Sequence, residues 1–193
     1  MIIRVVRYSL IAGVFALAGC TGAAGEPSTL PDLTAPPSGT PTPTASPTAE
    51  PPVEPDNAHE NSAEGVEAFT LYAIEVINYA YQTNDVTYLE QIRSDDCQFC
   101  DRTVDQLTVI GEAGGRIEGG QMSPGPLSIT GPTEGVQTSA GADVEISAST
   151  TIHGNGNLTD QQPARAVYFI FNLVREGEAW KLQEVLRASQ SLA

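Results

Sequence analysis

The chain has 193 residues, of which nine are Lys or Arg and 24 are Asp or Glu, so its formal charge is −15 at pH 7. Nucleic acids and anionic membrane surfaces would both repel so acidic a chain, and this excludes a nucleic-acid-binding function. The charge fits an acidic surface that keeps a folded domain in solution.

The first twenty residues have the pattern of a signal peptide. Arg4 and Arg7 precede an apolar run over residues 10–17, which is too short to span a bilayer, and small residues follow it. The ending Leu17-Ala18-Gly19-Cys20 resembles the lipobox of bacterial lipoproteins. That resemblance implies that the Cys20 thiol receives acyl chains such as palmitate before the signal peptide is removed. The alternative is an ordinary secretory signal with an incidental cysteine.

A lipid anchor on Cys20 predicts a protein attached to the cell membrane on its extracytoplasmic face. Two or more acyl chains give stable attachment, since each buried CH₂ contributes about 0.8 kcal/mol. No other stretch is apolar enough to span a membrane, so we expect the anchor to be lipid alone. Removal of residues 1–20 takes away two arginines and no acidic residue, which changes the formal charge from −15 to −17.

Residues 21–61 are predicted to form a disordered linker rich in Pro and Thr. They contain ten of the fourteen prolines, and no Lys or Arg occurs between Cys20 and Arg93. A segment with so little apolar surface cannot offset the entropy that ordering would cost. The folded domain is therefore expected over residues 62–193.

Helical periodicity follows the linker. Residues 61–64 have the spacing of a capping box, and an apolar stripe runs from residue 66 to about residue 81. Residues 83–85 interrupt the stripe, and Asn84 or Asp85 is positioned to cap a short second helix over residues 86–92. A third helix is predicted from about residue 96 to one of the glycines at 111, 114 and 115.

The remainder of the chain alternates as strands do. Residues 142–153 predict a half-buried strand, and residues 165–175, which are apolar on both faces, predict the central strand. A tight turn at residues 176–178 leads to a last strand that places three apolar side chains on one side: Trp180, Leu182 and Leu186. Weaker strand signals lie at residues 116–121 and 127–137.

Helices first and antiparallel strands after them predict an α+β fold. This order, with the ending Val-Arg-Glu-Gly-Glu-Ala-Trp-Lys-Leu over residues 174–182, resembles the NTF2-like superfamily, whose cone packs N-terminal helices on a curved antiparallel sheet. The lipobox, the linker and residues 63–69, 78–81 and 96–100 are similar to a family of actinobacterial lipoproteins that carry domain of unknown function 6318. The second resemblance covers roughly residues 60–190 and implies no activity.

Cys97-Gln-Phe-Cys100 is the local motif best suited to chemistry. In an exported protein a structural disulfide is the leading interpretation, because disulfides persist there. A redox dithiol is the second, but Asp95, Asp96 and Asp101 disfavour the thiolate that it needs. A zinc site is the third and would require two further ligands. We therefore predict a disulfide, with neither a metal nor a cofactor.

Four side chains are candidates for a pocket inside the cone. Strict strand alternation places Glu184 on the face of Trp180, so it is the one carboxylate predicted to point inward, unless a bulge turns it to solvent. Tyr72 and Tyr79 lie on the first helix, where aromatic side chains are usually core residues with hydroxyls at the rim. They would line a ligand site only in a hollow cone.

These patterns predict a cell-envelope lipoprotein whose domain binds a partner and is not an enzyme. The partner is either a small apolar ligand in the cone or another envelope protein on the exposed sheet face, and a homodimer through that face is a further alternative. The first rival is an isomerase- or cyclase-like enzyme with an acidic residue in an apolar cone. The second rival is a thiol-disulfide redox protein that acts through Cys97 and Cys100.

Overall fold

A computed structural model describes residues 49–188 of the chain. The predicted signal peptide, Cys20 and the linker as far as residue 48 lie outside the described residues. The described part begins with a short 3₁₀-helix and three α-helices: η1 (Asp56–His59), α1 (Ala63–Thr83), α2 (Thr87–Ile92) and α3 (Gln98–Glu112). Strands follow as far as Arg187, so the predicted order of helices and strands is confirmed.

Helix α1 begins and ends at residues that supply its caps. The Ser62 hydroxyl accepts a hydrogen bond of 3.1 Å from the N–H of Gly65, which satisfies a free donor of the first turn. Gly65 must be glycine, because a Cβ there would lie 2.1 Å from the carbonyl oxygen of Glu60. At the other end Asn84 takes the left-handed conformation, with φ of 59°, and closes the helix through the carbonyl of Ala80.

Asp85 lies one residue before Val86, the N-cap of the second helix, and its carboxylate binds the first residue of that helix. Its Oδ1 accepts a hydrogen bond of 3.0 Å from the N–H of Thr87, and its Oδ2 lies 3.4 Å from the hydroxyl of Tyr79. Hydrogen bonds from the side chain and then the backbone of Thr87 hold the pKa of Asp85 below its usual value. Partial burial raises that pKa by less, and the Tyr79 hydroxyl adds to the lowering.

This lowered pKa predicts a pH-dependent stability. Since the folded-state pKa of Asp85 lies below the unfolded value, its contribution is complete above the unfolded pKa and is lost as the pH falls through the folded pKa. Asp85→Ala should therefore cost about 1 kcal/mol at pH 7 and much less at the acid end of the range. Urea unfolding of the wild type and of Asp85→Ala, from pH 7 down to acid pH, measures this difference in the free energy of unfolding. Asp95→Ala, at an exposed neighbouring aspartate, is the control, and an equal loss at every pH would contradict the assignment.

The strands form two antiparallel sheets: β1 (Arg116–Gly119), β2 (Met122–Pro124), β3 (Ser128–Thr130), β4 (Thr138–Ile146), β5 (Ser149–Ile152), β6 (Leu158–Gln162), β7 (Arg165–Glu176) and β8 (Ala179–Arg187). The larger sheet has the order β2-β4-β7-β8 with β3 also paired to β4, and the smaller has the order β1-β5-β6. The single strand predicted over residues 142–153 is therefore wrong: it is β4 and β5, in different sheets. Strand β6 was not predicted.

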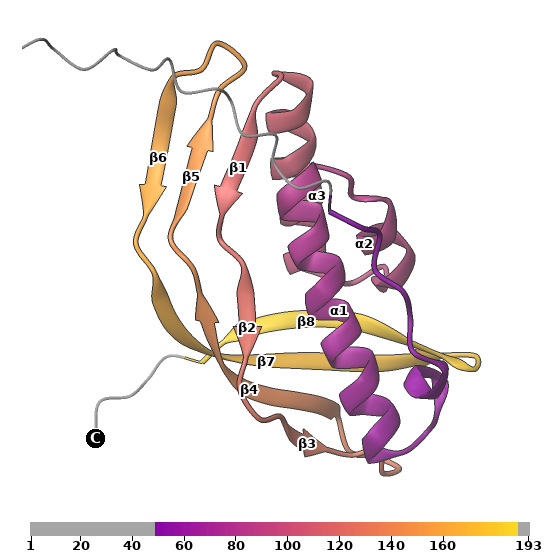
Figure 1. Ribbon diagram of the computed structural model, residues 1–193. Helices are drawn as coiled ribbons and strands as arrows, with labels where there is room; N and C mark the ends of the chain where they lie inside the picture. Colours follow the sequence, from indigo (N-terminus) through magenta and orange to yellow (C-terminus); the bar gives the residue numbers. More distant parts are fainter. Residues whose placement is uncertain (1–48, 189–193) are drawn as a thin grey trace, which may run out of the picture. The chain divides into compact units, whose positions relative to one another are not determined.

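A bend in one long hairpin separates the two sheets. Residues 147–148 break one arm and residues 163–164 break the other, at the same level, because Ile146 pairs with Arg165 and Ser149 pairs with Gln162. Pro163 has no N–H, so the hydrogen-bond ladder cannot continue through it. Figure 1 shows β5 and β6 turning away from β4 and β7 at this level. The curvature expected of a cone arises here.

A bulge changes which residues of β8 face inward. Asn172 pairs with Glu184 and Leu173 pairs with Leu182, so Gln183 has no partner and the alternation shifts by one. Val185 is consequently buried and Leu186 is 45% exposed. The prediction that Leu186 shares the face of Trp180 and Leu182 is wrong for this reason.

The N-terminal segment packs on the domain before α1 begins. Ala58 of η1 is fully buried, and the indole Nε1 of Trp180 donates a hydrogen bond of 2.9 Å to the carbonyl of Glu60. Arg175 donates to the carbonyl of His59 at 2.9 Å and lies 5.1 Å from the centre of the Trp180 ring. The ordered domain therefore starts before residue 62, where the sequence placed its boundary. We call residues 55–60 the N-terminal strap.

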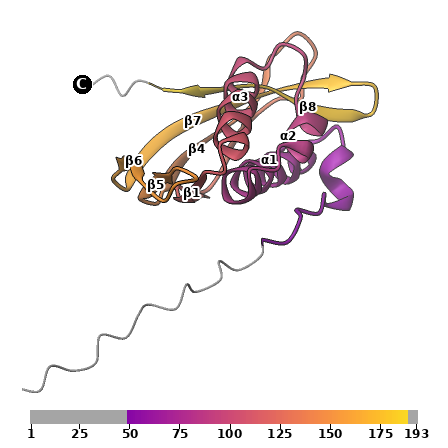
Figure 2. The same cartoon turned by 90° about the horizontal axis from the view of Figure 1, so that it is seen from above.

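The helices cover the concave side of the bent sheets, and the main core lies between these two layers. Figures 1 and 2 show α1 crossing the sheets and α3 beside it. Contacts join α1 to both sheets and α3 to β8. The large, fully buried side chains come from both layers and include Phe69, Ile77, Leu89, Phe171 and Leu182. The structure confirms the predicted α+β class, with N-terminal helices on a curved antiparallel sheet.

Candidate functional site

A cavity of about 580 Å³ opens between α3 and the bend of the sheets. Its apolar lining comes from α3 and from strands of both sheets: Phe99, Ile117, Met122, Ile146, Phe169 and Val185. Most of these side chains are buried or half-buried, so they form the floor. The floor of the site is therefore apolar.

Three exposed arginines line the same cavity. Arg102 comes from α3, Arg165 is the first residue of β7 and Arg187 is the last residue of β8. Within residues 49–188 their guanidinium groups make no ion pair or hydrogen bond. Arg165 acts on the neighbouring Tyr81: burial raises the pKa of that hydroxyl, while Thr103 and the positive charge of Arg165 lower it by less.

The other cations of the described chain are engaged elsewhere. Arg93 pairs with Asp101 and Arg116 pairs with Glu118, each at 2.7 Å. Arg175 holds the N-terminal strap, as described above, and Lys181 donates to the carbonyl of Gln91. Unpaired positive charge in residues 49–188 is therefore concentrated at this cavity.

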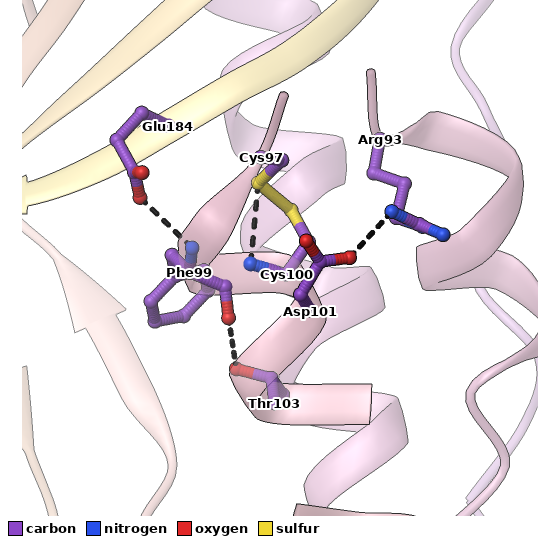
Figure 3. Close-up of polar contacts among 7 residues, drawn as sticks. All are labelled: Arg93, Cys97, Phe99, Cys100, Asp101, Thr103 and Glu184. Carbon is purple, nitrogen blue, oxygen red and sulfur yellow. Dashed lines mark hydrogen bonds and ion pairs between the residues drawn. A yellow bond between two sulfur atoms is a disulfide. The ribbon is translucent and has the colours of Figure 1, made fainter. Parts of the chain in front are cut away.

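Two carboxylates also line the cavity, and both are held by other groups. The Oε1 atom of Glu184 accepts hydrogen bonds of 3.0 Å from the N–H groups of Phe99 and Val185, as the close-up of this region shows for Phe99 (Figure 3). Asp160 accepts from the amide of Gln162 at 2.9 and 3.1 Å. Glu184 thus caps the first turn of α3 from a distant strand, which is a structural role.

Cys97 and Cys100 form a disulfide, as the leading interpretation predicted. Both residues are fully buried at the start of α3, and the Cys97 sulfur also accepts a hydrogen bond of 3.2 Å from the N–H of Cys100 (Figure 3). A redox site needs sulfur that a partner thiol can reach. The burial therefore favours a structural role for this pair over the redox alternative.

The four predicted pocket residues do not meet in one place. Glu184 lines the cavity described above, whereas Trp180 lies at a separate hollow of about 440 Å³ beside residues 132–138. Tyr79 borders another hollow, of about 270 Å³, and Tyr72 is buried in the core. Burial raises the pKa of Tyr72, and Glu54, Tyr88 and Glu75 raise it further.

The three arginines of the cavity were not predicted from the sequence. One signal was available for Arg165, because strand alternation places it on the face of Phe169 and Phe171. No comparable signal existed for Arg187, since the bulge at Gln183 decides its face. Arg102 lies one helical turn after Phe99, and only the packing of α3 on the sheets brings it to the cavity.

The chain matches the model of a protein family of unknown function, DUF6318, over residues 40–186. It belongs to that family. The match covers the helices and strands of this DUF6318 domain as far as residue 186, with Arg102 and Arg165 of the cavity, and it ends one residue before Arg187. No curated protein sequence matches the chain.

Two solved structures are similar to the DUF6318 domain in fold. The intermembrane-space region of the chloroplast protein ARC6 has a TM-score of 0.50 at 12% identity, over 68% of this chain and 99% of that chain. A protein with a cystatin-like fold from Caulobacter vibrioides has a TM-score of 0.40 at 16% identity, over 66% of this chain and 92% of that one. At such identities the likeness concerns the fold alone.

Within residues 49–188, no group of three or more His, Cys, Asp or Glu side chains is arranged to hold a metal ion. None of the helices in this range has the length and apolar character needed to cross a membrane.

Proposed function

We propose that this DUF6318 protein is a lipid-anchored, extracytoplasmic binding protein whose cavity takes up a small molecule. The cavity of about 580 Å³ is the observation that supports this function. Ligand sites are usually concave, roughly 300–1,000 Å³ in volume and mostly apolar with a few polar groups. The volume of the cavity lies in that range, and its apolar floor lies below a polar rim that includes the three arginines.

The enzymatic alternative has less support. An isomerase- or cyclase-like site would use a carboxylate free to exchange a proton with the ligand. Glu184 is the predicted candidate, and two backbone N–H groups hold one of its oxygens at the start of α3. The redox alternative has less support because both sulfurs of Cys97 and Cys100 are buried.

Blocking the cavity tests the binding function. Gln106, on α3, lines the cavity and is exposed, so Gln106→Trp should fill it without disturbing the core. Thr108→Trp, on the same helix but outside the cavity, is the matched control. We expect native mass spectrometry of the full chain, isolated from the cell envelope, to detect a bound small molecule in wild type and Thr108→Trp and to lose it in Gln106→Trp. A chain that never carries a small molecule would contradict the proposal.

The lipid anchor is tested separately. Cys20→Ala should remove the acylation site, so the variant is expected in the released or unprocessed fraction while the wild type remains with membranes. Cell fractionation followed by intact-mass measurement of both forms checks this. A Cys20→Ala variant that fractionates with membranes as the wild type does would rule out attachment through Cys20.

A further inference from the structure

Unpaired arginines are unexpected in a chain with 24 acidic and only nine basic residues. In such a chain each cation has many carboxylates available, and Arg93 and Arg116 do form ion pairs. Arg102, Arg165 and Arg187 form none within residues 49–188, although Asp160 and Glu184 line the same cavity. Their positive charge is therefore available to a ligand.

Arg165 and Arg187 occupy positions where an apolar side chain would continue the inward face of their strands. Along β7 the inward face reads Leu173, Phe171, Phe169 and Val167 toward the bend, and Arg165 is the next residue on that face. On β8 the inward face reads Leu182 and Val185 across the bulge, and Arg187 follows and pairs with Phe169. Both apolar rows thus end in a guanidinium group at the edge of the cavity.

Helix α3 brings the third guanidinium to the same edge. Phe99 and Arg102 are three residues apart, so they lie on one face of the helix, and both line the cavity. Glu184 fixes the first turn of this helix through the N–H of Phe99, and the Cys97–Cys100 disulfide closes the same turn (Figure 3). The hydrogen bond from Phe99 to Glu184 therefore holds the start of α3 against β8, and the disulfide fixes the turn from which Arg102 follows.

We propose that the cavity binds an amphiphilic anion, with its acidic headgroup at the three arginines and its apolar body on the floor. This rests on the binding function proposed above and names the class of its ligand. Guanidinium groups bind carboxylate, sulfonate and phosphate oxygens through paired N–H donors, and the exposed rim keeps such a headgroup in contact with water. The apolar floor, which includes Phe99 and Phe169, excludes water from the hydrocarbon or aromatic part of such a ligand.

Matched amphiphiles of one chain length test the proposal. The protein is the full chain carrying Cys20→Ala, so that no anchor acyl group competes for the cavity. The probes are dodecanoate, dodecyl phosphate and uncharged dodecanol, each titrated by calorimetry below its aggregation concentration, and inorganic phosphate alone. We expect the two anions to bind at least about tenfold more tightly than dodecanol, because hydrogen bonds to charged groups are the stronger ones. Inorganic phosphate should bind too weakly to measure.

Neutralising the arginines separates headgroup from body. Arg102→Gln and Arg187→Gln should each lower the affinity for dodecanoate by about tenfold and leave the affinity for dodecanol unchanged. Arg116→Gln alters the net charge equally but lies outside the cavity, so it is the control and should change neither affinity. The ratio of dodecyl phosphate to dodecanoate affinity then assigns the headgroup to the phosphate or the carboxylate class.

Each contrary result has one meaning. Equal affinities for dodecanoate and dodecanol, unaltered by Arg102→Gln and Arg187→Gln, would overturn the anionic headgroup and leave a purely apolar binding site. Affinity for inorganic phosphate equal to that for dodecyl phosphate would overturn the apolar body. Absence of binding by any amphiphile, with Gln106→Trp indistinguishable from wild type, would overturn the binding function itself.

Discussion

Replacing Trp180 with alanine should lower the free energy of unfolding by about 4 kcal/mol, the largest effect we expect from one substitution. The indole is only 4% exposed and packs under the guanidinium of Arg175. Its Nε1 also donates the hydrogen bond of 2.9 Å that holds the carbonyl of Glu60. The substitution thus leaves a cavity and also releases the N-terminal strap.

The companion variant Trp180→Phe divides this loss into its parts. It keeps most of the ring packing but has no N–H, so about 1 kcal/mol should be lost, mainly from the hydrogen bond to Glu60. Urea unfolding gives both values, and cleavage after Glu60 by a glutamate-specific protease reports whether the strap has detached. A loss below about 1 kcal/mol for Trp180→Ala would mean that the strap contributes little to the fold.

Asn78 on α1 pairs with the exposed backbone edge of β2, and its replacement gives the second large effect. Its Nδ2 donates to the carbonyl of Met122 at 2.9 Å, and its Oδ1 accepts from the Met122 N–H at 2.8 Å. Strand β2 pairs only with β4 among the described strands, so the amide takes the place of a further strand. Asn78→Asp loses the donor and sets a carboxylate against a carbonyl, which should cost about 3 kcal/mol.

Gln82 supplies the matched control for this prediction. It lies one turn further along α1 and contacts the side chain of Gln121 at the exposed surface, where hydrogen bonds contribute little. Gln82→Ala should change stability by less than about 0.5 kcal/mol in the same urea measurement. Because Met122 also lines the cavity, Asn78→Asp should weaken dodecanol binding as well, whereas Gln82→Ala should not. Equal stability of the two variants would contradict the proposed role of Asn78.

The helical half of the fold was largely predictable from the sequence because local signals determine it. Ser62, Asn84 and Asp85 act within a few residues of themselves, as caps and breakers, and they end or begin helices wherever the chain goes. The tight turn after β7 is equally local: Glu176 pairs with Ala179, and Gly177 takes a φ of 66°. The short ring of the Cys97–Cys100 disulfide belongs to the same class.

The strands were less predictable because partners distant in sequence set their limits. The alternation of residues 142–153 continues through the bend, and only the pairing opposite Pro163 divides it into β4 and β5. The bulge at Gln183 likewise depends on the register with β7, and it reverses the faces of Leu186 and Val185. A pattern with a period of two cannot reveal such a shift.

The sequence by itself determined the α+β class, the three α-helices, the residues that begin and end α1, the cysteine pair and the resemblance to the family that the chain proved to match. Tertiary structure alone decided the cavity, since Arg102, Arg165 and Arg187 come from a helix and two strands that meet only when α3 packs on the bent sheets. It also decided the role of Glu184, whose partner Phe99 lies 85 residues earlier. Caps and turns are local interactions, whereas a ligand site is a set of side chains that only long-range packing brings together.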